Sequence, residues 1–187
     1  MTVRAITAAD WPSIEALFGA KGACGGCWCM WARLPQGGKL WEESKGEKNR
    51  RSFRRLVESE KVHAVMAFDG KTPVGWCCFG PRSDFPRLAR VRALQRDWNP
   101  DTWSIVCFYV SPQWRKKGVA SRLLEAATVR ALAAGAREIE GYPVVSKTPV
   151  AIPAAFAWTG VPKLFQIAGY KKLARPDQPR PIFLLSK

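Results

Sequence analysis

The sequence lacks any long apolar run. Among its 187 residues, no stretch reaches the roughly 18 to 20 uncharged apolar residues that span a bilayer. The opening segment, residues 1–11, lacks the apolar core of a signal peptide. We therefore expect a cytoplasmic protein with no membrane partner, and its length suits a single domain with a buried core.

Acidic side chains are scarce. The chain has 15 Asp and Glu against 30 Lys and Arg, for a net charge of +15. Such an excess favours an acidic partner, for example a nucleotide, a nucleic acid or an anionic surface. Charge alone does not choose among these partners, and a basic, solvated surface would explain it equally well.

Metal ligands are also few. Histidine occurs once, at His63, and the six cysteines lie in a chain without an export signal, so we expect reduced thiols rather than a disulfide framework. Cys24 and Cys27 have metal-like spacing, but a structural zinc site needs four ligands and usually a second close pair. Cys77 and Cys78 are adjacent in a segment with the pattern of a strand, so their side chains should point to opposite faces of the sheet. We therefore predict no metal and a packed cysteine-rich loop.

The pattern of apolar residues predicts an α/β protein. A continuous apolar strand over 103–110, a helix over 118–134 and a strand over 139–145 form a parallel pair joined by a right-handed crossover. Residues 62–68 and 73–79 flank a turn and predict an antiparallel hairpin. The other expected elements are a strand at 2–7, helices at 12–18, 48–61 and 158–168, and closing strands at 170–174 and 182–185.

Two long segments fit no regular pattern. Residues 21–48 mix Gly, Cys and Trp with charge, and residues 82–101 form a basic connection with a helical stretch around 87–94. Irregular segments of this kind shape binding clefts in many proteins.

The residues that indicate a chemical function lie in the loop between the 103–110 strand and the 118–134 helix. A helix N-terminus presents unsatisfied N–H groups and partial positive charge, which favour an anion. Gly118 leaves room for close approach and Ala120 keeps the next turn small, while Arg115, Lys116 and Lys117 add charge. The fingerprints G-x-G-x-x-G and G-x-x-x-x-G-K-[ST] are both absent. A pyrophosphate is the anion that suits this loop.

The segment Arg115-x-x-Gly118-x-Ala120, after an apolar strand, resembles the [RQ]-x-x-G-x-[GA] acetyl-CoA signature of the GNAT superfamily of N-acetyltransferases. The opening strand and helix, the hairpin and the step Phe165-Gln-Ile-Ala-Gly-Tyr170 also resemble that family. The resemblance implies a GNAT fold, a mixed α/β sheet whose central parallel strands splay apart. We expect one such domain over residues 1–187, with an irregular Cys/Trp-rich insertion at about 21–48.

The same resemblance implies where acetyl-CoA, the cosubstrate, binds. Main-chain groups of three strand residues would pair with the pantetheine arm: Phe108, Tyr109 and Val110. The following loop and helix start would hold the pyrophosphate: Arg115, Lys116, Lys117, Gly118, Val119, Ala120 and Ser121. The thioester would lie between the splayed strands, where a strand N–H polarises its carbonyl and an amine attacks it directly.

The sequence departs from the family at the proton donor. Many members carry a Tyr where this chain has Phe165, and a phenyl ring has no proton to donate. Either the thiolate leaves unassisted, or Tyr142 or Tyr109 takes over. For the catalytic pair we choose Glu140 as base and Tyr142 as acid, since both lie on one face of the 139–145 strand. An ordinary ion pair between Glu140 and a nearby Arg is the alternative.

These observations predict an acetyl-CoA-dependent N-acetyltransferase that acts on a primary amine of an unidentified small molecule or protein. One alternative is a basic nucleic-acid-binding protein, although no nucleic-acid motif is present. A second is a GNAT-fold protein that binds acyl-CoA without turnover. Exposed tryptophans and the closing strands would suit a homodimer interface.

Overall fold

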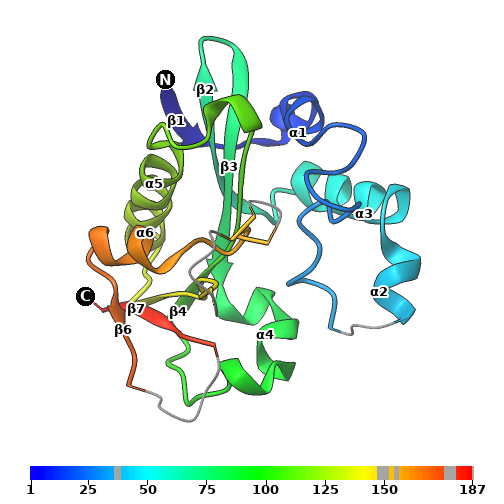
Figure 1. Cartoon of the computed structure of the whole chain (residues 1–187). Helices are drawn as coiled ribbons and strands as arrows, with labels where there is room; N and C mark the ends of the chain where they lie inside the picture. The colour runs from blue at the N-terminus through cyan, green and yellow to red at the C-terminus, as the bar shows by residue number, and fades with distance from the viewer. Residues whose placement is uncertain (36–38, 147–151, 154–155, 175–179, 187) are drawn as a thin grey trace.

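The computed structural model describes residues 1–35, 39–146, 152–153, 156–174 and 180–186 (Figure 1). Its centre is a seven-stranded sheet in the order β1-β2-β3-β4-β5-β7-β6, and of its six pairings only β4 with β5 is parallel. The strands are β1 Thr2–Ala5, β2 His63–Asp69, β3 Thr72–Pro81, β4 Thr102–Val110, β5 Glu138–Gly141, β6 Lys171–Lys172 and β7 Phe183–Ser186. The predicted mixed α/β sheet is confirmed.

Helices cover both faces of the sheet. Figure 1 shows α5 on one face, and α1 with α3 on the other. The helices are α1 Trp11–Phe18, α2 Lys39–Ser44, α3 Glu47–Glu58, α4 Pro86–Arg90, α5 Val119–Ala133 and α6 Pro162–Ile167. Because each face has its own apolar cluster, the central residues of β2 and β3 are buried on both sides. Within the described ranges, no helix is long and apolar enough to cross a membrane.

The predicted hairpin is present as β2 and β3. Its strands meet at the pair Asp69 and Thr72, and Gly70 takes the left-handed conformation (φ 57°) that this tight turn requires. In this hairpin β3 pairs with β4, the central strand that leads to the predicted loop.

The two parallel strands separate after a short ladder. Residues Thr102–Ile105 of β4 pair with Glu138–Gly141 of β5, but β4 continues to Val110 without this partner. The strand predicted at 139–145 therefore ends at Gly141. On its other side, β4 pairs Cys107 with Cys78 and Ile105 with Phe79, so Val106 forms a β-bulge. A bulge bends its strand and strengthens the local twist, which favours separation at this level.

Other elements differ from expectation mainly at their ends. Pro162 begins α6, so the helix predicted over 158–168 is shorter, because a proline is favoured in the first helical turn. The closing strands shrink to Lys171–Lys172 and shift to Phe183–Ser186. The segment 21–48 is irregular through Pro35 but then contains α2. It packs against the 82–101 connection, where the Arg87 N–H donates to the Ala32 carbonyl (3.3 Å).

Candidate active site

The loop after β4 forms an exposed turn at the start of α5. Residues Arg115–Gly118 are exposed, and both Lys116 and Gly118 have left-handed backbones (φ 60° and 75°). A Cβ added to Gly118 would meet no atom within 4 Å, so the space in front of the helix is open. The N–H groups of the first turn of α5 therefore face open space at the positive end of the helix dipole.

One contact ties this loop to the end of β4, and a second lies within the loop. The Arg115 Nε donates to the Val110 carbonyl (3.1 Å), and the Lys117 ammonium lies 5.1 Å from the centre of the Trp114 ring. Neither contact neutralises the cation. Open N–H groups and uncompensated charge are what a pyrophosphate needs, so the predicted set from Arg115 to Ser121 fits the anionic part of acetyl-CoA.

The space between the separated strands is bridged by the segment Trp158–Gly160. The Phe108 N–H of β4 donates to the Trp158 carbonyl (2.6 Å), while the Val144 N–H on the other side donates to the Gly160 carbonyl (3.0 Å). The backbone N–H predicted to face the pantetheine arm thus already has an acceptor. The sequence did not indicate this contact, because residues 158–161 were predicted to be helical.

Glu140 and Tyr142 lie in a buried network where the strands begin to separate. The Glu140 Oε2 accepts hydrogen bonds from Arg82 Nη1 (2.5 Å) and from the Tyr142 hydroxyl (2.6 Å). The same hydroxyl lies 2.7 Å from Ser104 Oγ, and Ser104 is paired with Glu140 in the β4–β5 ladder. Glu140, Tyr142 and Arg82 are 0%, 1% and 3% exposed. A second arginine, Arg96, bonds the other Glu140 oxygen.

Burial, aided by the negative charge of Glu140, raises the pKa of Tyr142 far above its usual value. The phenol therefore keeps its proton at neutral pH. Glu140 forms ion pairs with two arginines, as in the alternative interpretation of its sequence position. The sequence gives no signal for Arg82, because only the fold brings this residue of the basic connection to β5. Catalytic roles for Glu140 and Tyr142 stay predictions.

Phe165 of α6 packs against the end of β5, close to the point where β4 and β5 separate. Its ring is fully buried, 6.2 Å from the Phe108 ring and 5.3 Å from the Tyr170 ring. A Cβ on Gly141, the last residue of β5, would lie 2.1 Å from it. The position where many family members have a Tyr is thus an apolar core position here.

One cysteine of the insertion, Cys29, reaches the sheet. Cys29 interacts with Cys107 of β4 and Cys78 of β3; its hydrogen bond with Cys107, together with burial, raises the pKa of Cys29 well above its usual value. Trp28 and Cys29 both have positive φ (46° and 56°), which directs this turn onto the strands. In the part of the chain that the structure describes, no group of three or more His, Cys, Asp or Glu could hold a metal ion.

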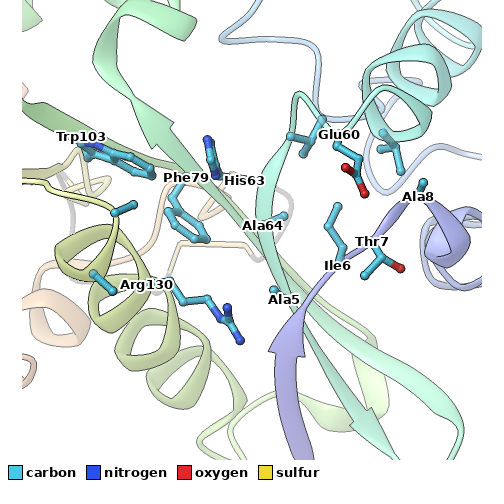
Figure 2. Close-up of a pocket in the computed structure, with 14 residues that line it drawn as sticks. Ala5, Ile6, Thr7, Ala8, Glu60, His63, Ala64, Phe79, Trp103 and Arg130 are labelled. Carbon is cyan, nitrogen blue, oxygen red and sulfur yellow. The ribbon is translucent and has the colours of Figure 1, made fainter.

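A cavity of about 440 Å³ opens away from this region (Figure 2). It lies beside the end of β1 and the last turns of α5, and its lining includes Ile6, His63, Phe79, Trp103 and Arg130. The ring of His63 is 4.8 Å from that of Trp103. Because the predicted anion site is at the opposite end of α5, this cavity is separate from the candidate active site.

Comparison with known proteins gives two kinds of match. The Acetyltransferase (GNAT) family model matches residues 29–152. An N-acetyltransferase from Staphylococcus aureus Mu50 is 17% identical, with a TM-score of 0.58 and coverage of 99% of this chain and 97% of that one. A search of curated proteins gave no significant match.

Two further structures with a similar fold are described as coenzyme complexes. One is a phosphinothricin acetyltransferase from Sinorhizobium meliloti with AcCoA: 17% identity, TM-score 0.54, coverage 100% and 86%. The other is the PaiA N-acetyltransferase from Thermoplasma acidophilum with coenzyme A: 15% identity, TM-score 0.52, coverage 100% of both chains. At these identities the likeness concerns the fold. The family model, which spans most of the chain and includes the β4 to α5 loop, establishes that the protein belongs to the Acetyltransferase (GNAT) family, with acetyl-CoA-dependent acyl transfer as its activity.

Proposed function

We propose that this protein transfers the acetyl group of acetyl-CoA to a primary amine of a small molecule or a protein. The observation that carries the proposal is the open, positively charged turn from Arg115 to Ser121, located where β4 ends and α5 begins. It adjoins the gap between two parallel strands that have stopped pairing. An extended cosubstrate with an anionic end and an uncharged arm matches this arrangement.

In this proposal the residues divide into two groups. The first turn of α5 and the cations of Arg115, Lys116 and Lys117 bind the pyrophosphate. The main chain of Phe108, Tyr109 and Val110 lines the pantetheine arm. Acetyl-CoA supplies an activated thioester carbonyl, and a strand N–H such as that of Phe108 is the group available to polarise it. For that contact, the Trp158 carbonyl must first release the Phe108 N–H.

For the proton transfers we propose Tyr142 as the donor to the departing thiolate, with Glu140 supporting it. The proton that the attacking amine loses passes to water, and a proton from water restores the phenol. The support for this choice is that the phenol is protonated and adjoins the point where the strands separate. Glu140 accepts the Tyr142 hydrogen bond while held by two arginines, so in this scheme its carboxylate orients the phenol. The alternative, binding without turnover, predicts that no CoA is released, because Phe165 provides no proton for the thiolate.

The test is a calorimetric titration with acetyl-CoA at physiological salt, using two matched variants. Gly118→Glu places a carboxylate in the predicted pyrophosphate site. Gly135→Glu makes the same change beyond the other end of α5, where the glycine also has positive φ (97°) and open space around it. Both variants strain the backbone in a similar way.

We expect one-to-one binding by the wild type and by Gly135→Glu, and at least a 100-fold loss of affinity in Gly118→Glu. This estimate reflects loss of charge-assisted contacts worth about 1.5–3 kcal/mol plus like-charge repulsion. Equal affinities in the two variants would place the pyrophosphate elsewhere. No binding by the wild type would overturn the proposed function.

A further inference from the structure

Arg87 and Arg180 lie near the separated strands, but their surroundings differ from those of Arg82 and Arg96. Arg82 and Arg96 both form ion pairs with Glu140. By contrast, burial lowers the pKa of Arg87 and of Arg180, and within the described ranges neither guanidinium has a carboxylate within 4 Å. A half-buried cation without a counter-charge is unfavourable unless a ligand supplies one.

Both arginines adjoin the segment that bridges the strands. Arg180 Nη2 lies 3.4 Å from the hydroxyl of Thr159, a long contact to a buried neutral group. Thr159 follows Trp158, whose carbonyl accepts the Phe108 N–H. Arg180 therefore contacts the residue that follows the Trp158 carbonyl, the acceptor of the Phe108 N–H.

Arg87 reaches the same segment through a pair of tryptophans. Its guanidinium lies 4.5 Å from the centre of the Trp31 ring, and the Trp31 ring is 4.8 Å from that of Trp158 at an angle of 65°. Trp31 belongs to the 21–48 insertion and Arg87 to the basic connection. The two irregular segments, 21–48 and 82–101, thus place an aromatic surface and positive charge next to Trp158, whose carbonyl accepts the Phe108 N–H.

Acetyl-CoA does not account for this charge. In the proposed function its phosphates lie at the far end of the gap, against Arg115 to Ser121, and its pantetheine arm is uncharged. An acceptor substrate with a negative group would place that group beside Trp158 and Thr159, where it meets this charge. The aromatic rings of Trp31 and Trp158 offer an apolar surface next to that charge.

We infer that the acceptor is a small primary amine bearing an oxyanion, a carboxylate or a phosphonate, next to an apolar body. Arg180 binds the oxyanion, while the apolar body packs on Trp31 and Trp158. Arg87 positions Trp31 and adds positive potential. This inference rests on the proposed acetyl transfer and gives it a substrate class.

The experiment uses amines with a phenyl group that carry a carboxylate, a phosphonate or a neutral carboxamide, one, two or three carbons from the nitrogen. CoA release is measured for each, and each rate is referred to its fraction of unprotonated amine. We expect at least one anionic amine to exceed its carboxamide about 10- to 100-fold in kcat/KM, the range for charge-assisted hydrogen bonds. The carboxylate and phosphonate series then show which oxyanion is preferred.

Arg180→Gln should remove this preference by lowering kcat/KM for the anionic amine and sparing the carboxamide. Arg137→Gln is the matched control, because Arg137 is exposed and its ion pair with Asp101 (3.3 Å) lies on the surface. Acetyl-CoA affinity, measured separately, should be the same in all three proteins. If acetyl-CoA binds but carboxamides react as well as anionic amines, or no amine reacts, or Arg180→Gln lowers both rates equally, the inference is wrong. If acetyl-CoA does not bind, the proposed function itself fails.

Discussion

Replacing Glu140 with Gln tests whether the buried network holds the two central strands at the level where they separate. The substitution keeps the size of the side chain and removes its charge. In the wild type this carboxylate accepts hydrogen bonds from Arg82 (2.5 Å) and Tyr142 (2.6 Å) and is fully buried. In the variant, the Arg82 cation would stay buried without its counter-charge.

Breaking one side of such a buried ion pair costs about 3–5 kcal/mol. For a chain of this length, 1 kcal/mol corresponds to about 2–4 °C in Tm, so Glu140→Gln should melt about 6–20 °C lower. The measurement is urea unfolding followed by circular dichroism, with the midpoint and slope fitted separately. An unchanged slope would confirm that the change concerns stability rather than the extent of unfolding.

Glu58→Gln is the control, because the Arg54–Glu58 contact has a similar length (2.7 Å) but its side chains are 50% and 46% exposed. Exposed helix pairs of this kind contribute about 0.3–0.5 kcal/mol. Equal losses in the two variants would refute the reasoning, because burial would then make no difference. A stable Glu140→Gln protein that binds acetyl-CoA but has lost turnover would instead assign Glu140 a direct part in proton transfer.

Three further predictions concern neighbouring positions. Tyr142→Phe should lower kcat about 100-fold or more with little change in KM, and an acetyl donor with a more acidic thiol should restore most of the rate; an unchanged kcat would mean that the thiolate leaves unassisted. Gly141→Ala should destabilise the protein by about 1–3 kcal/mol in urea unfolding, because its Cβ would overlap the Phe165 ring; a loss below about 0.5 kcal/mol would show that the ring moves aside. The rings of Phe79 and Trp103 partly desolvate His63 and lower its pKa, so the imidazole binds its proton more tightly in the unfolded chain than in the folded one. The contribution of His63 to stability is complete above the unfolded pKa of about 6.5 and is lost as the pH falls. His63→Gln should therefore make the free energy of unfolding change less steeply with pH across that acidic range. An unaltered pH dependence would contradict this role of His63.

Most of the fold could be predicted from the sequence, because the patterns that define its main elements are local. The hairpin depended on a turn at Gly70, and α5 on a regular apolar stripe, and both lie close to their predicted positions. The predicted anion site depends on the same kind of local signal, since its strand, loop and helix are consecutive in the sequence; the binding role of its residues stays a prediction. Errors arose where the path depends on distant residues. β5 ends at Gly141 because β4 bends away, and α6 begins late because the chain first bridges the gap through Trp158.

The substrate side of the site was unreadable for a related physical reason. Arg82 and Arg87 look alike in sequence, as basic residues of one connection. In the fold, Arg82 meets Glu140 from across the sheet, whereas Arg87 stacks on Trp31 without a carboxylate nearby in the described part of the chain. Which arginine is neutralised within the protein, and which keeps its charge for a ligand, depends on contacts between segments more than 50 residues apart. The net charge of +15 therefore acquires a specific meaning only once those contacts are known. Arg82 and Arg96 are neutralised by Glu140 within the β4–β5 ladder. In our inference, the unpaired Arg87 and Arg180 are the residues that favour an anionic acceptor.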